Sequence, residues 1–283
     1  MIKKICVFGI LSLLVIFGLK AQGKLPVDSK NVVFAHDFSK NSLGEYSNEE
    51  WSKDWKNPPW ANRANGLGII KAENGNQFLQ VEFPANTFLL DGAGLQWFLN
   101  FDSSYTDLYF TYKVRFSDEM TWQELHGKLP GLAGGTKNIG GGDLPDGYTG
   151  WSARYMFAKT DIVMYLYHPD IYKCGNYSDA RPVEGKRYYG EGVWLKPNHM
   201  MNPNTWYTLT QHVVMNTPTE HNGYIEAFIN GELVAKRENL RFRDTSSLAI
   251  DKMYFSTFMG GSGERPVRDC YLDFDDFEIY YNK

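Results

Sequence analysis

The chain has 283 residues, with 29 lysines and arginines against 33 aspartates and glutamates. A net acidic chain is a poor candidate for general nucleic-acid binding, so any site for a polyanion must gather its basic side chains in one cleft. We find no Pro/Ser/Gly-rich linker, low-complexity tract or internal repeat, which predicts a single domain.

The first 22 residues have the pattern of a secretory signal peptide. Lys3 and Lys4 precede an apolar run that is too short to span a bilayer, and Ala21 lies at a plausible cleavage point. The predicted mature chain, 23–283, keeps 26 basic and 33 acidic residues, a net charge of −7. No later stretch is apolar enough to cross a membrane, so we expect a secreted or periplasmic protein with no membrane partner.

Strand signals dominate the rest of the chain, and helical periodicity is almost absent apart from a turn or two at 48–56. Asn222-Gly223 and Asn230-Gly231 are hairpin signals on either side of one strand. The predicted strands cover 106–116, 151–157, 162–168, 206–216, 224–229, 232–236, 253–258 and 271–281. This pattern predicts an all-β sandwich, jelly roll or barrel, and we favour a single-domain β-jelly-roll whose concave sheet can hold a chain-like ligand.

Polar side chains alternate on two of these predicted strands. Ser152 and Arg154 share one face of the first strand, and Tyr165 and Tyr167 share one face of the second. Lys128 comes just ahead of a glycine-rich segment, 134–150, that we expect to be a long loop. The plainer interpretation is that these are ordinary strand residues facing water. The functional interpretation requires the two strands to be neighbours, which would gather the groups on one surface.

Seven motifs occur in order along the chain, and together they resemble polysaccharide lyase family 14, a jelly-roll family of alginate and glucuronan lyases. The similarity covers roughly 101–281, and less clearly the segment before it. The motifs are KLPGL at 128–132, WSAR at 151–154, YLYHP at 165–169, TWYTLTQHVVMN at 205–216, NGYIEAFINGELV at 222–234, YFSTFMGGSG at 254–263 and DFDDFEIYY at 273–281.

The resemblance implies a catalytic set made of a Lys, a Ser and an Arg two apart, and a Tyr-x-Tyr. These positions are Lys128, Ser152, Arg154, Tyr165 and Tyr167. The implied reaction is β-elimination on an acidic, uronate-containing polysaccharide. Lys and Arg would neutralise the uronate carboxylate, and a tyrosine whose pKa is lowered by those cations would transfer protons. This chemistry requires neither metal nor cofactor, because the cations are side chains.

Further positions remain candidates or alternatives. His126 and Gln211 could contact substrate, although a core role for Gln211 is equally compatible with the pattern. We expect His168 to be structural, since it falls on the face opposite the two tyrosines. Cys174 and Cys270 could form a disulfide or remain buried thiols.

The acidic run at 273–278 lacks the spacing of a calcium loop and predicts a solvated face. We expect a monomer. A non-catalytic carbohydrate-binding jelly roll is the main alternative to an enzyme. A glycoside hydrolase is a weaker one, because no pair of carboxylates stands out.

Overall fold

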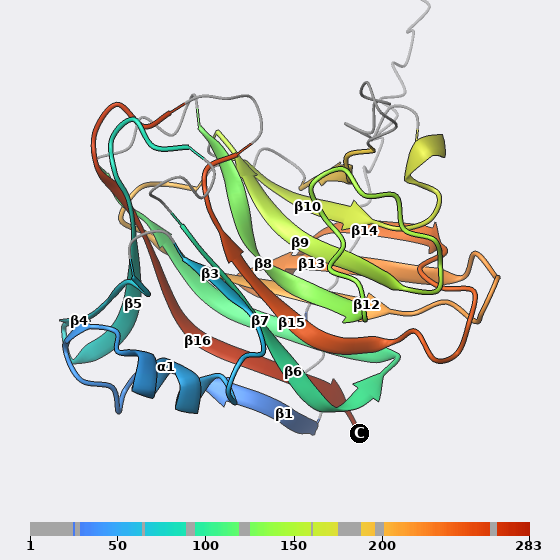
Figure 1. Cartoon of the computed structure of the whole chain (residues 1–283), viewed down its shortest axis with the longest axis horizontal. Helices are drawn as coiled ribbons and strands as arrows, with labels where there is room; N and C mark the ends of the chain where they lie inside the picture. The colour runs from blue at the N-terminus through green and yellow to red at the C-terminus, as the bar shows by residue number, and fades with distance from the viewer. Residues whose placement is uncertain are drawn as a thin grey trace, which may run out of the picture.

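The computed structural model describes residues 25, 29–63, 66–88, 94–118, 125–159, 161–174, 188–195, 201–260 and 265–283. Two antiparallel sheets pack face to face and enclose the core (Figure 1). Within these ranges, no helix is both long and apolar enough to cross a membrane. The predicted signal peptide lies outside the described residues.

The larger sheet has nine strands in the described ranges, in the order β14-β13-β12-β7-β16-β5-β4-β2, with β1 paired to β16. Its strands are β1 (Lys30–His36), β2 (Gly44–Glu45), β4 (Ile69–Glu73), β5 (Asn76–Phe83), β7 (Asp107–Phe116), β12 (Trp206–Val214), β13 (Gly223–Ile229), β14 (Glu232–Leu240) and β16 (Cys270–Asn282). Its inward side chains alternate along each strand, as in β12, where Leu209 and Val213 join the core.

The smaller sheet has seven strands in the described ranges, in the order β11-β10-β9-β8-β15-β6-β3. Its strands are β3 (Ala61–Arg63), β6 (Leu95–Tyr105), β8 (His126–Gly135), β9 (Gly150–Ala158), β10 (Asp161–Tyr167), β11 (Glu191–Trp194) and β15 (Ile250–Thr257). A 3-10 helix, η2 (Ile171–Lys173), follows β10.

The short helix α1 (Asn48–Asp54) closes the sandwich beside β1 and β4 (Figure 1). Ser47 caps it by accepting a hydrogen bond from the Glu50 amide. Trp55, just after the helix, is fully buried, with ring centroids 5.1 Å from Trp97 of β6 and 5.3 Å from Phe277 of β16. The helix therefore joins both sheets through one aromatic cluster.

The predicted jelly-roll class is confirmed, and each predicted strand matches an observed one within a few residues. The expected loop at 134–150 starts too early, because β8 continues to Gly135. Glycines in β8 do not mark turns. A Cβ on Gly131 would lie 2.0 Å from the Ala153 carbonyl oxygen, and one on Gly134 would lie 1.8 Å from that of Ala249. These glycines let neighbouring strands approach closely.

Replacing Gly131 with Ala should therefore destabilise the protein. The added methyl would also lie 2.5 Å from the Cα of Arg154, so backbone must move in β8 or β9. We expect a loss of roughly 1–3 kcal/mol, typical of overpacking. Urea unfolding measures this loss of stability. The control is Gly231→Asn, a substitution at a turn residue with positive φ and open space around it. Equal stability of both variants would contradict the close packing.

The acidic run in β16 is only in part the solvated face that the sequence predicted, because Asp276 and Glu278 reach solvent whereas Asp273 and Asp275 do not. Asp273 and Asp275 are buried, and the β16–β7 ladder is regular at both residues and becomes irregular only between Asp275 and Glu278. Asp273 accepts from the guanidinium of Arg115 at 2.8 Å, and Asp275 accepts from the Asn76 amide at 2.7 Å. Hydrogen bonds from side chains on β5 and β7 thus satisfy both buried carboxylates.

Burial raises the pKa of Asp275 to about 6. An aspartate with a folded pKa above its unfolded value lowers stability where it is ionised in both states, and this cost fades as the pH falls below the folded pKa. Asp275→Asn should therefore raise the free energy of unfolding by roughly 1–3 kcal/mol at about pH 8 and change it little near pH 4. Chemical denaturation at both pH values tests this. A gain that is larger at the lower pH would contradict the assignment.

The two described cysteines do not form the disulfide considered above. No disulfide joins Cys174 to Cys270. Cys174 follows η2 and contacts Glu191, whereas Cys270 begins β16 and donates to the Phe83 carbonyl. The two cysteines belong to different parts of the sandwich. The even number of cysteines in the predicted mature chain is therefore no sign of a disulfide here.

Candidate active site

Strand register brings the two pairs of alternating residues together. In the β9–β10 ladder, Arg154 lies opposite Tyr165 and Ser152 lies opposite Tyr167. The rings of Tyr165 and Tyr167 meet edge to face, with centroids 5.4 Å apart. The alternate residues on β9 point into the core, where the Tyr155 hydroxyl donates to the Thr210 carbonyl of the larger sheet. The four polar side chains therefore share the face of the smaller sheet that is turned away from the larger sheet.

Lys128 joins this face from β8. It lies opposite Met156 in the β8–β9 ladder, and its Nζ is 2.8 Å from the Met156 sulfur. The same Nζ lies 4.0 Å from the centroid of the Tyr165 ring, which places a cation directly over the tyrosine. The structure thus brings together all five residues that the family resemblance indicated: Lys128, Ser152, Arg154, Tyr165 and Tyr167.

Three residues that the sequence analysis did not select hold Arg154 in place. The Arg154 guanidinium lies 4.7 Å from the Tyr254 ring centroid and donates to the Ser256 hydroxyl at 3.2 Å. Both Tyr254 and Ser256 donate to the Gln96 amide oxygen. Tyr254 and Ser256 alternate on β15 within the YFSTF motif, so the same alternation rule applied to that strand would have found them.

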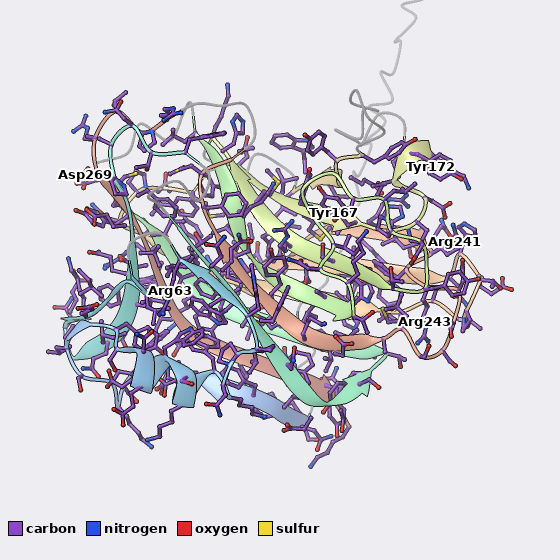
Figure 2. The ribbon with its side chains drawn as sticks, viewed as in Figure 1. Arg63, Tyr167, Tyr172, Arg241, Arg243 and Asp269 are labelled. Atoms are coloured by element: carbon purple, nitrogen blue, oxygen red, sulfur yellow. The ribbon has the colours of Figure 1, made fainter. Side chains whose placement is uncertain are left out.

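Two segments contact three of the five residues. The loop after β8 contributes the Gly142 amide, which donates to the Tyr167 hydroxyl at 3.3 Å, and the Ile139 carbonyl, which accepts from Ser152. The strap before β11 (188–190) contributes the Gly190 amide, which donates to the Tyr165 hydroxyl at 3.0 Å. Figure 2 shows Tyr167 on the same side of the molecule as Tyr172 and Arg241, the side on which η2 lies. The loop and the strap therefore contact Ser152, Tyr165 and Tyr167 through backbone groups.

The electrostatics of Tyr165 differ from the expectation. Burial raises the pKa of Tyr165 well above its usual range, and Tyr167 adds to this, whereas Arg154 and the Gly190 amide lower it only in part. The expected lowering of this pKa by neighbouring cations is wrong for Tyr165, because desolvation outweighs them. Tyr165 is therefore a neutral phenol that can donate a proton.

Of the two candidates for substrate contact, His126 lies near the site and Gln211 does not. His126 lies on the same face as Lys128, two residues earlier on β8, and is partly exposed. Gln211 does not join the site: it is fully buried between the sheets, where its side-chain oxygen accepts from the Leu132 amide at 3.0 Å. Its role is to satisfy backbone next to the bulge at Pro130, since the irregular ladder there lacks regular pairing.

A cavity of about 840 Å³ lies elsewhere, between α1 and the larger sheet. His36, Asp54 and Lys113 are among its lining residues, and none of the five residues of the candidate site borders it. The residues that line this cavity include both acidic and basic side chains. The candidate site lies instead on β8, β9 and β10, where Lys128 and Arg154 flank Tyr165.

Comparison with known proteins gives a consistent result. The family model described as polysaccharide lyase 14 matches residues 71–277. A marine PL-14 alginate lyase from Aplysia kurodai has a similar structure, with a TM-score of 0.71 and 21% identity over 88% of this chain and 98% of that one.

Alginate lyase Aly36B gives a TM-score of 0.67 and 23% identity over 88% of this chain and 96% of that one. Alginate lyase vAL-1 from a Chlorella virus gives 0.65 and 15% identity over 88% and 99% of the two chains. No curated protein matched the sequence.

Proposed function

The chain belongs to polysaccharide lyase family 14 and is a polysaccharide lyase, and on that premise we propose that it cleaves an acidic, uronate-containing polysaccharide such as alginate or glucuronan by β-elimination. The observation that carries the proposal is the cation pair Lys128 and Arg154 beside Tyr165 on one face. The similar alginate lyases support alginate as the first polymer to test.

Elimination removes the C5 proton of a uronate and expels the sugar linked through O4. The C5 proton becomes acidic enough only if the neighbouring carboxylate is neutralised, because the negative charge that develops must be delocalised into it. Arg154 can supply this in bidentate form, since its Nε is buried and has no partner among the described residues. Lys128 would add a second positive charge, and Ser152 would hydrogen-bond substrate.

The buried environment of Tyr165 suggests one of the proton-transfer roles. Tyr165, held neutral by burial, suits the general acid that protonates the leaving O4. Tyr167 and Lys128 are then the candidates for the base that takes the C5 proton, and kinetics of single variants distinguish them. No step of this scheme needs a metal or a cofactor.

An assay on polymers tests the proposal. The purified protein is incubated with alginate, glucuronan and a neutral glucan, and ultraviolet absorbance follows the unsaturated sugar that elimination creates. We expect the absorbance to rise with at least one polyuronate and not with the glucan. Binding without such a rise for any polyuronate would favour the carbohydrate-binding alternative.

We also propose that the chain is exported through its N-terminal segment and acts as a monomer. The pattern of residues 1–22 supports export. Fractionation of the producing cells and light scattering of the purified protein test these two statements separately.

A further inference from the structure

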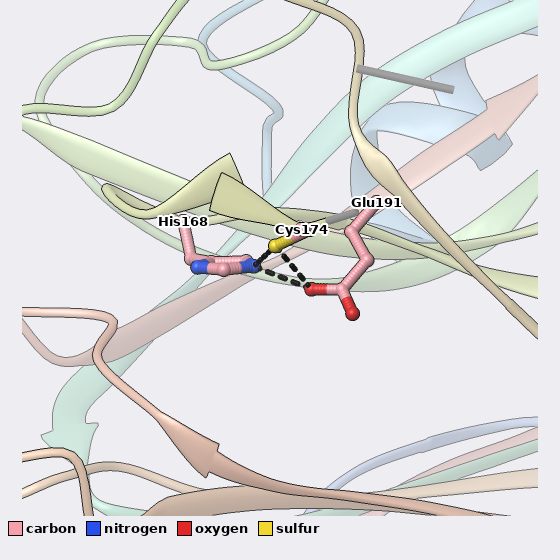
Figure 3. A group of neighbouring side chains, drawn as sticks. All are labelled: His168, Cys174 and Glu191. Atoms are coloured by element: carbon pink, nitrogen blue, oxygen red, sulfur yellow. Dashed lines mark hydrogen bonds and ion pairs between the residues drawn. The ribbon is translucent and has the colours of Figure 1, made fainter. Parts of the chain in front are cut away.

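A second cluster of side chains that could bind a metal lies at the end of β10 and the start of β11, outside the proposed catalytic set. His168 follows β10, Cys174 follows η2, and Glu191 begins β11. Each residue offers one possible ligand atom, and these three atoms all lie within 4.8 Å of one another (Figure 3). The atoms are Nε2 of His168, Sγ of Cys174 and Oε2 of Glu191. His168 and Glu191 are almost fully buried, and Cys174 is partly exposed.

We propose that His168, Cys174 and Glu191 form a binding site for a divalent transition-metal ion of the zinc class. An imidazole nitrogen, a thiolate and a carboxylate oxygen are a donor set that zinc takes in proteins. Calcium and magnesium prefer oxygen ligands alone, so the sulfur and nitrogen donors disfavour them. Three protein ligands leave a fourth position for water.

The spacing of the donor atoms fits such an ion after a small expansion. The Nε2–Sγ, Sγ–Oε2 and Nε2–Oε2 distances are 3.6, 3.1 and 2.7 Å. A tetrahedral zinc ion with ordinary bond lengths needs about 3.5, 3.5 and 3.3 Å. The Sγ–Oε2 and Nε2–Oε2 distances must therefore lengthen by about 0.4–0.6 Å when the ion binds.

The surroundings hold the three ligands from both sheets. Arg237 of β14 donates to the other Glu191 oxygen, Oε1, at 2.7 Å and leaves Oε2 for the cluster. Arg241 binds both oxygens of Asp170, at 3.0 and 3.1 Å, and so fixes the start of η2, the short helix that Cys174 follows. The Nδ1 of His168 has no partner among the described residues, so the tautomer that coordinates through Nε2 carries a buried Nδ1–H with no acceptor there, a cost that the metal bond must offset.

Without metal, the cysteine thiol donates to the same Glu191 oxygen that the imidazole contacts. Metal binding would replace the thiol proton, which is released to solvent, and move the imidazole proton to Nδ1. The ion would then join the end of β10 to Glu191, which directly follows the strap. Because the Gly190 amide donates to the Tyr165 hydroxyl, the ion would fix the strap over the proposed acid without touching substrate.

Metal binding by the full chain tests the proposal without any polysaccharide, so its failure is distinct from failure of the proposed lyase reaction. The protein is stripped with a chelator and titrated with Zn²⁺ or Co²⁺ alone. We expect one zinc ion per chain and a cobalt spectrum with a thiolate charge-transfer band and tetrahedral visible bands. At a zinc concentration about a hundredfold above Kd, the Tm should rise by roughly 5–10 °C.

Cys174→Ser should weaken zinc binding by more than about 100-fold, beyond the loss caused by an outer contact, and abolish the cobalt charge-transfer band. The matched control is Cys270→Ser, which removes the other described thiol and should bind as wild type does. If Cys174→Ser fails to fold, alkylation of wild-type Cys174, followed by peptide mass, should be slowed by zinc. A wild type that retains no zinc, or equal binding by both serine variants, would overturn the proposal.

Discussion

Replacing Tyr165 with Phe should lower kcat on a cleaved polyuronate by roughly 10²–10⁴, the usual contribution of a general acid or base. The change removes only the hydroxyl that accepts from the Gly190 amide, and the ring keeps its contacts with Lys128 and Tyr167. The lost hydrogen bond should cost about 1 kcal/mol of stability, too little to unfold the protein. Binding of intact polymer should persist, because both cations remain.

Tyr167→Phe and Tyr148→Phe complete this experiment. Tyr167 is the second candidate for proton transfer, whereas Tyr148 is an exposed residue of the loop after β8 and serves as the matched control. Steady-state kinetics should show a large loss for Tyr165→Phe and none for Tyr148→Phe. Near-wild-type rates for both Tyr165→Phe and Tyr167→Phe would remove the tyrosines from the mechanism and make Lys128 the leading proton-transfer group.

Replacing Arg154 with Lys should lower kcat/KM by roughly 10²–10³, comparable to the loss of a preorganised donor to a developing oxyanion. Lysine keeps the charge but loses the planar fork that stacks on Tyr254 and donates to Ser256. A single ammonium cannot bind a uronate carboxylate in bidentate form while keeping those contacts.

The control for Arg154→Lys is Arg63→Lys. Arg63 is exposed and also lies over an aromatic ring, 5.6 Å from the Trp51 centroid, but far from β9 in the sheet order. Its replacement should leave kcat/KM unchanged. Equal activity of the Arg154→Lys variant and wild type would mean that carboxylate recognition does not depend on this guanidinium.

The sequence was sufficient for features that repeat with period two. Alternation on 151–157 and 162–168 correctly predicted the shared faces of Ser152, Arg154, Tyr165 and Tyr167, and the register of β9 and β10 aligned them. The end of β8 was not predicted, because its glycines resemble turn signals. Their role, which is to let the strands carrying the Ala153 and Ala249 carbonyls approach closely, depends on contacts that only the folded structure shows.

Contacts between distant segments could not be predicted from local pattern. The local pattern left substrate contact and a core role equally open for Gln211, and the contact with the Leu132 amide of the other sheet decides for the core. Burial in the folded sheet raises the pKa of Tyr165 more than Arg154 lowers it, so the expectation from neighbouring cations gave the wrong direction. Asp273 and Asp275 were likewise buried by partners on other strands.

Mass spectrometry of the products tests the central claim most directly, namely that this face of β8, β9 and β10 carries out an elimination. Wild type and the combined variant Lys128→Met/Tyr165→Phe are incubated with the same polyuronate, and the released oligosaccharides are weighed. We expect wild-type products lighter by one water than those of hydrolysis, with none from the variant. Products of hydrolytic mass, or unsaturated products formed equally by the variant, would contradict it.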